Sequence, residues 1–104
     1  MIDVSTEKVA RVIALSRENG PDDDHLHDYI GSFNDDEKAE LVALMWVGRE
    51  TFSPAEIGDA KRVARYEASV PTENYLSGIP ELAEYLEDGM DMLGINVMAV
   101  EAAL

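Results

Sequence analysis

His25 and His27, set among aspartates, are the residues of this sequence that most suggest metal chemistry. Imidazole and carboxylate groups suit zinc or nickel. Residues two apart on a helix point about 200° away from each other, so these two histidines cannot bind one ion together there. A carboxylate four residues away is better placed, as Asp23 is relative to His27, but no third or fourth ligand is evident. We therefore expect a solvated acidic segment and no metal site.

The densest cluster of cations consists of Lys61, Arg62 and Arg65. A helix and a turn precede it, so the arrangement is reminiscent of a helix-turn-helix, whose second helix enters the DNA major groove. The net charge of −14 opposes this interpretation, because acidic surface repels a phosphate backbone. We expect these cations to pair with the protein's own carboxylates or to contact a partner, and we expect no nucleic-acid binding.

Four further side chains could line a binding pocket: Trp46, Arg49, Tyr75 and Tyr85. Trp46 lies in a strongly apolar run, where a tryptophan more often belongs to the core than to a ligand site. Arg49 comes at the C-terminal end of the same predicted helix, where the helix dipole favours a cation. The chain has no cysteine, nucleophile–base arrangement or glycine-rich phosphate loop, so we expect no catalytic residues and no cofactor.

A helix over residues 35–48 must position several of these side chains. Asn34 is a favourable N-cap, and Glu37 three residues later completes a capping-box pattern. The run Leu41–Val47 is apolar on nearly all sides, so other helices must surround it. We therefore expect the 35–48 helix to be the buried centre of the fold, with Trp46 in the core.

Caps, prolines and glycines mark the ends of the other predicted helices. Ser53-Pro54 is a strong start, because serine caps a helix and proline fits its first position. Gly20-Pro21 is a strong stop, because glycine adopts the left-handed C-cap and proline cannot continue the helix. The other boundaries are a start at Asp3 or Ser5, an end at Pro71, a short turn from Thr72 to Gly78, and a helix from Pro80 to Gly94.

Composition places these helices in one domain over residues 1–104. No segment alternates apolar and polar residues over roughly four to eight positions, so we assign no strands. Hydrophobic residues make up 46% of the chain, enough for a core, but no run is long enough to span a membrane. We predict an all-α, compact, single-domain bundle of about four to six helices. With no signal-peptide pattern and 22 acidic residues against 8 basic, we expect a cytoplasmic protein that binds neither nucleic acid nor membranes.

The segment from Ile95 to Leu104 is apolar, with one charged residue, Glu101. An apolar end of this kind must pack against its own core or meet another copy. We predict a homodimer through this segment, and the alternative is a tail that folds against the first helix. Because the protein is strongly acidic, any such dimer should tighten as salt is added.

Two segments carry a recognisable pattern. They are Leu41-Val42-Ala43-Leu44-Met45-Trp46-Val47-Gly48-Arg49 and Tyr75-Leu76-x-Gly78-x-Pro80-x-Leu82-Ala83-x-Tyr85-Leu86-Glu87-x-Gly89. The region of roughly residues 25–94 resembles a family of small bacterial helical domains, domain of unknown function 3775. The resemblance implies a small helical bacterial protein and implies no activity, cofactor or catalytic residue. Its motif residues are the first candidates for a shared site: Trp46, Gly48, Arg49, Tyr75, Gly78 and Tyr85.

These observations leave two main classes of function open. We expect a non-catalytic protein-interaction or adaptor module that works through its surface. The alternative is a small-ligand-binding protein or an enzyme with a pocket near Trp46, Arg49, Tyr75 and Tyr85. A concave, partly polar pocket with titratable groups would favour the alternative. The charge by itself also fits an acidic mimic that occupies nucleic-acid-binding proteins.

Overall fold

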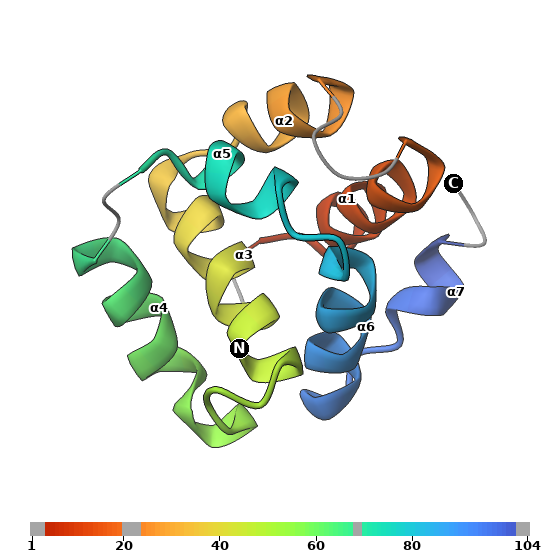
Figure 1. The fold of residues 1–104 in the computed structure, drawn as a ribbon. Helices are drawn as coiled ribbons and strands as arrows, with labels where there is room; N and C mark the ends of the chain where they lie inside the picture. Colours follow the sequence, from red (N-terminus) through yellow and green to blue (C-terminus); the bar gives the residue numbers. More distant parts are fainter. Residues whose placement is uncertain (1–3, 20–23, 68–69, 102–104) are drawn as a thin grey trace.

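Helices make up most of the chain in the parts that the structure, a computed structural model, describes: residues 4–19, 24–67 and 70–101. No strand occurs in these ranges, so the predicted all-α single domain is confirmed. Within them, none of the helices has the length and hydrophobicity needed to cross a membrane. The elements are α1 (Thr6–Asn19), α2 (Asp24–Gly31), α3 (Asp35–Gly48), the 3₁₀ turn η1 (Pro54–Glu56), α4 (Ile57–Tyr66), α5 (Thr72–Ser77), α6 (Leu82–Met92) and α7 (Val97–Glu101) (Figure 1).

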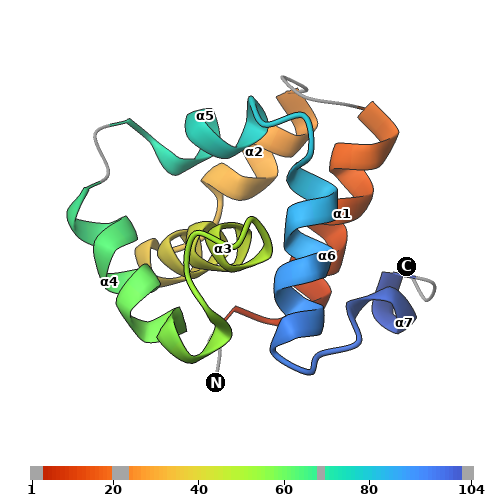
Figure 2. The same ribbon diagram turned by 60° about the horizontal axis from the view of Figure 1, so that its bottom comes forward.

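Helix α3 is the centre of the fold, as its all-round apolar sequence predicts. Figure 2 views it nearly end-on, with α4 on one side, α6 on the other and α5 above. The predicted capping box is present: Asn34 Oδ1 accepts the Glu37 N–H at 2.8 Å, and Glu37 Oε1 accepts the Asn34 N–H at 3.0 Å. Every residue from Ala39 to Gly48 is buried except Trp46. Trp46 is partly buried and packs against the core cluster, so the expectation that it belongs to the core is met only in part.

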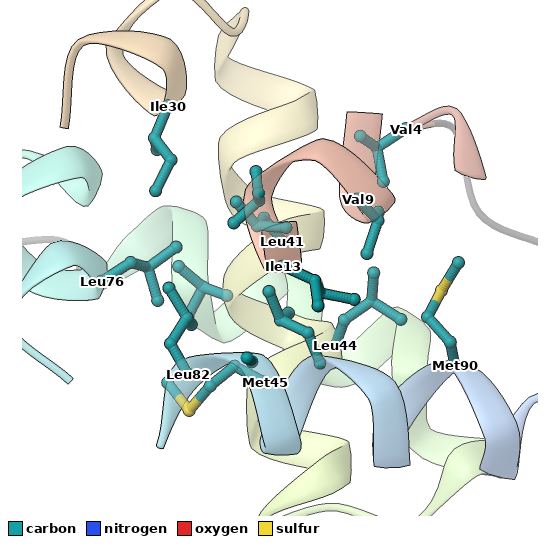
Figure 3. Packing of buried hydrophobic residues seen from close by; sticks show 14 of the residues in the cluster. Val4, Val9, Ile13, Ile30, Leu41, Leu44, Met45, Leu76, Leu82 and Met90 are labelled. Carbon is teal, nitrogen blue, oxygen red and sulfur yellow. The ribbon is translucent and has the colours of Figure 1, made fainter. Parts of the chain in front are cut away.

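Buried side chains from the surrounding helices close over α3. Figure 3 shows aliphatic residues of α1, α2, α5 and α6 converging on Leu41, Leu44 and Met45. Burial of one such side chain contributes about 1.5–3 kcal/mol. Fully buried or nearly fully buried members of this cluster include Val4, Val9, Ile13, Ile30, Leu41, Leu44, Met45, Leu76, Leu82 and Met90.

Helices α3 and α6 approach each other so closely that there is no room for a side chain where their backbones meet. A Cβ atom on Gly48 would lie 1.7 Å from the Tyr85 carbonyl oxygen, and one on Gly89 would lie 2.3 Å from the Leu44 carbonyl oxygen. Both obstacles are backbone atoms, which cannot move aside as a flexible side chain can. Two motif glycines are therefore required by the packing of α3 on α6.

The first and last helices pack against each other. The Lys8 N–H bonds to Ser5 Oγ at 3.1 Å, which places Ser5 as the cap of α1. Helix α7 lies against α1 (Figure 2), and Val97 is buried there. The described part of the tail thus adopts the folded-back alternative, while self-association stays a prediction. The predicted stop at Gly20-Pro21 lies outside the described residues.

A buried carboxylate fixes the N-terminal segment that precedes α1. Glu40 on α3 is 2% exposed, and its Oε1 accepts the Val4 N–H at 2.7 Å. Its Oε2 lies 3.5 Å from the Lys61 Nζ of α4. A buried charge is costly unless it is paired and hydrogen-bonded, and both conditions are met here. Glu40 therefore ties the N-terminal segment, α3 and α4 together.

Candidate functional site

A groove between α4 and α5 leaves one face of α3 accessible. Its main pocket has a volume of about 160 Å³ and is lined by Val42, Trp46, Ala64, Glu67, Val70, Thr72 and Tyr75. A second pocket of about 150 Å³ continues it toward the start of α3 and is lined by Asp35, Lys38, Ala39, Ala64, Arg65 and Thr72. Ala64 and Thr72 belong to both linings, so the two pockets form one groove.

The groove is open because the residues where α4 faces α3 are small. Ala60 and Ala64 are the buried positions of α4, and each ends at Cβ. After α4, Pro71 interrupts helical geometry and the chain turns into α5, which brings Thr72 and Tyr75 to the opposite wall. A larger residue at Ala64 would fill the space that both pockets share.

Trp46 and Tyr75 are brought together in this groove. The indole Nε1–H of Trp46 donates to the hydroxyl oxygen of Tyr75 at 3.2 Å. Phe52 stacks on the Trp46 ring, with centroids 5.7 Å apart and planes 27° apart. The hydrogen bond and the stacked ring fix the orientation of the indole, so part of its surface forms a preorganised wall of the pocket.

Arg49 and Tyr85, the other two predicted site residues, lie outside the lining of this pocket. Arg49 is exposed, and its Nε–H donates to Thr51 Oγ1 at 3.2 Å. Tyr85 is partly buried on α6, where its backbone carbonyl faces Gly48. Gly78, another motif residue, is exposed at the end of α5. The structure thus brings together half of the predicted four-residue set.

Two exposed apolar side chains lie in the groove lining or next to it along the chain. Val70 lines the pocket and is 53% exposed, and Tyr66, next to the lining residue Glu67, is 84% exposed. Large apolar side chains at such exposure have no role in the core of this chain. Tyrosine is enriched at protein interfaces, where its ring supplies contact area and its hydroxyl a hydrogen bond.

The basic cluster on α4 is engaged by the protein's own carboxylates. Lys61 pairs with Glu40 at 3.5 Å, Arg62 pairs with Asp59 at 2.9 Å, and Arg65 pairs with Asp36. Two of these three ion pairs join α4 to α3. The sequence left two alternatives for these cations, pairing with the protein's own carboxylates or contact with a partner, and the structure shows the first arrangement. The pairs with Glu40 and Asp36 help to attach α4 to α3.

His27 joins α2 to α5 without evident metal chemistry. Its ring contacts Asn74 Oδ1 through Nε2, and Nδ1 lies 3.3 Å from Asp28 Oδ1. The hydrogen bond to Asn74, followed by that to Asp28, raises the pKa of His27 above its ordinary value. Among the described residues, no three histidine or acidic side chains gather where they could hold a metal ion. Asp22 and Asp23 lie outside those residues.

Glu73 lies beside this contact, at the start of α5. A hydrogen bond from its own backbone N–H, and then the cation of Lys38, hold the pKa of Glu73 below its ordinary value. The Lys38 Nζ lies 3.2 Å from Glu73 Oε1 and forms an ion pair with it. The pair connects α3 to α5, and Lys38 also lines the second pocket.

The remaining residues of the main pocket were not predicted as site residues by sequence analysis. Val42, Ala64, Glu67, Val70 and Thr72 come from three separate segments, and their convergence depends on how α4 and α5 pack. Two local signals could have found part of the set. The apolar Val70 directly precedes a helix-breaking proline, and Ala64 belongs to a stripe of alanines too small to fill a helix interface.

Fold and site define a class: a small, acidic, all-α domain around a buried central helix, with an apolar groove along that helix. Residues 23–95 match the family model described as a protein of unknown function, DUF3775. The match spans well over half of the chain, so the chain belongs to this family, as its motifs predicted. Neither the curated proteins nor the solved structures contain a match. The matched residues include α2 to α6 and leave α1 and α7 outside.

Proposed function

We propose that the protein is a non-catalytic interaction module whose groove accepts an apolar side chain of a partner protein. The observation that carries the proposal is the pocket at Trp46 and Tyr75, with Val70 exposed on its rim. Interfaces owe most of their affinity to a few anchors in such pockets, and aromatic residues are frequent there. Val70 and Tyr66 would supply apolar contact around the anchor.

The volume of the pocket beside Trp46, taken without the adjoining pocket, suits a single side chain better than a free ligand. Pockets for small molecules and cofactors usually measure about 300–1,000 Å³. This pocket measures about 160 Å³, close to an engineered cavity of about 150 Å³ that holds one benzene. Space of that size suits a leucine side chain or an aromatic ring. A small-ligand site or an enzyme near Trp46 and Tyr75 is the second candidate, favoured by the hydroxyl groups of Thr72 and Tyr75 in the lining.

The test introduces a charge at the rim of the groove. Val70→Lys places an ammonium group where the proposal requires apolar contact, and Val70 is exposed enough for the fold to tolerate it. Met92→Lys is the matched control, because Met92 is another exposed apolar residue, at 39%, and does not line the groove. Each variant is used to capture proteins from a bacterial lysate, with quantitative mass spectrometry of what is retained.

The proposal expects proteins that the wild type and Met92→Lys retain and that Val70→Lys loses. Circular dichroism of both variants shows that any loss is not caused by unfolding. Equal retention by all three proteins would contradict an interaction at this groove. A heat-stable small molecule that shifts the melting temperature of the wild type but not of Val70→Lys would instead support the ligand-binding alternative.

A further inference from the structure

The groove carries uncompensated negative charge in both of its pockets. Glu67 lines the apolar pocket and Asp35 lines the adjoining one. Neither carboxylate forms an ion pair with any residue in the described ranges. The cations of the groove, Lys38 and Arg65, are each already engaged by a carboxylate of this chain. An occupant of the groove therefore meets two free carboxylates and no free cation.

The length of the groove sets the spacing of the groups that would fill it. Asp35 is the first residue of α3 and Trp46 follows eleven residues later. At 1.5 Å per residue this part of the helix is about 16 Å long, the reach of about five residues of extended chain. One short peptide segment can thus reach both pockets, with an apolar side chain beside Trp46 and polar groups that point toward Glu67 and Asp35.

The charge of the whole protein further restricts which kind of segment can occupy the groove. At least six of the eight lysine and arginine side chains pair with carboxylates of this chain, in a protein of net charge −14. Such a surface attracts cationic partners over distances of about a Debye length and repels acidic ones. A second copy of this chain, itself strongly acidic, would be a poor occupant of the groove.

We infer that the partner segment is cationic: one apolar side chain enters the pocket beside Trp46, and lysine or arginine residues of the same segment contact Glu67 and Asp35. The inference rests on the proposed function and adds the chemistry of the partner to it. The apolar anchor supplies burial, and the two carboxylates supply orientation and selection against acidic segments. Both requirements come from groups that line one groove.

The test selects peptides without assuming a natural partner. A displayed library of random peptides about twelve residues long, longer than the five or so that span the groove, is panned on the full chain. Tryptophan is omitted from the library, so that binding can be followed by the fluorescence of Trp46, the chain's single tryptophan. Selected peptides are then titrated against wild type, Val70→Lys, Glu67→Gln and Glu84→Gln. Glu84 is exposed on α6 and makes the same charge change away from the groove.

The expected peptides carry a leucine, isoleucine or phenylalanine together with lysine or arginine, and quench or shift the fluorescence of Trp46. Glu67→Gln should weaken the binding of these peptides about twofold to fivefold, as for the loss of one exposed ion pair. Glu84→Gln should change their affinity less. Affinity should fall as salt is raised, because the carboxylates become screened. Peptides lost on Val70→Lys but free of basic residues, or insensitive to Glu67→Gln, would overturn the cationic partner and leave the proposed function standing. If no selected peptide depends on Val70, or none is selected, both proposals are wrong.

Discussion

Glu50 is the one described non-glycine residue with a positive φ, at 67°. It follows the last turn of α3, where the N–H of Thr51 bonds to the Trp46 carbonyl and that of Glu50 bonds to the Val47 carbonyl, both at 2.9 Å. This is the Schellman arrangement, which glycine normally occupies. At the end of α6 the equivalent position is held by Gly94, with φ 79°. Glu50 therefore carries backbone strain that Gly94 avoids.

We predict that Glu50→Gly stabilises the protein. A non-glycine residue in the left-handed region costs about 1–2 kcal/mol. Glycine removes this strain, but it also raises the conformational entropy of the unfolded chain, which offsets part of the stabilisation. The net increase in the free energy of unfolding should be about 0.5–1 kcal/mol. Glu50→Gln is the control, because it removes the charge and keeps the strain. Urea denaturation of both variants measures the difference, and equal stability of the two would contradict the strain argument.

Glu37 links the stability of the protein to pH. Its Oε2 lies 2.6 Å from the Lys8 Nζ of α1, and its Oε1 accepts the Asn34 N–H. The bond to Lys8, followed by that to Asn34, lowers the pKa of Glu37 below its ordinary value of 4.5. A lowered pKa means that the native state favours the charged form. The stabilisation is therefore complete above pH 4.5 and is lost as the pH falls below it.

We predict that Glu37→Gln destabilises the protein at neutral pH by about 0.5–1 kcal/mol, because an ion pair and a favourable charge at a helix N-terminus are lost. The difference from wild type should shrink as the pH is lowered toward 3, in the range where Glu37 of the wild type becomes protonated. Glu84→Gln, at an exposed position, corrects for the general effect of removing one negative charge. Denaturant titrations at a series of pH values provide the measurement, and a pH-independent difference would rule out this role of the carboxylate.

At the scale of the elements, the contact between α3 and α6 decides how the bundle is assembled. Gly48 and Gly89 lie where the two backbones meet, and each lacks space for even one Cβ atom. The two helices can bury Leu44, Met45, Leu86 and Met90 between them because the backbones come this close. Gly48 and Gly89 are therefore packing residues, whatever role their neighbours have in the groove.

We predict that Gly48→Ala and Gly89→Ala each destabilise the protein by about 3 kcal/mol, because the added methyl group must push two backbones apart. Gly58→Ala is the control. A Cβ atom at Gly58 would meet nothing within 4 Å, and alanine in helix α4 should stabilise by about 0.5–1 kcal/mol. Thermal melts of the three variants make the comparison. If Gly48→Ala melts like the wild type, the close approach of α3 and α6 is wrong.

At the scale of the whole molecule, charge works in two opposite directions. Cations are placed between helices, as in the pairs of Lys8 with Glu37, Arg17 with Glu87, and Lys38 with Glu73. The excess of 22 acidic over 8 basic residues leaves the surface repelling itself. Exposed ion pairs contribute little each, whereas the repulsion is summed over the whole surface. The repulsion should therefore dominate the response to salt.

We predict that the melting temperature at neutral pH rises as salt increases from about 0.01 to about 1 M, which shortens the Debye length from about 30 to about 3 Å. A variant with three exposed carboxylates neutralised, Glu81→Gln, Glu84→Gln and Asp88→Asn, should melt higher at low salt and respond less to added salt. Differential scanning calorimetry records both curves. A melting temperature that falls with salt would show that the interhelical ion pairs outweigh the repulsion.

The sequence by itself determined the features that depend on neighbours along the chain. The capping box at Asn34, the burial of the apolar helix that follows it, and the stop at Gly94 are local consequences of side-chain chemistry and helical period. The family motifs were also readable, and they match over residues 23–95. Each of these features is read from consecutive residues along the chain, so no tertiary structure was needed to find them.

Only the tertiary structure decided which motif residues share a site. Trp46 and Tyr75 are 29 residues apart and meet in the groove, whereas Arg49, three residues from Trp46, lies outside the lining of the main pocket. The same packing shows Gly48 to be a spacer between helices. An apolar run that is buried on nearly every side does not reveal which of its positions will be only partly covered. That depends on alanines of another helix being too small to cover Trp46, a relation between distant segments that no local pattern encodes.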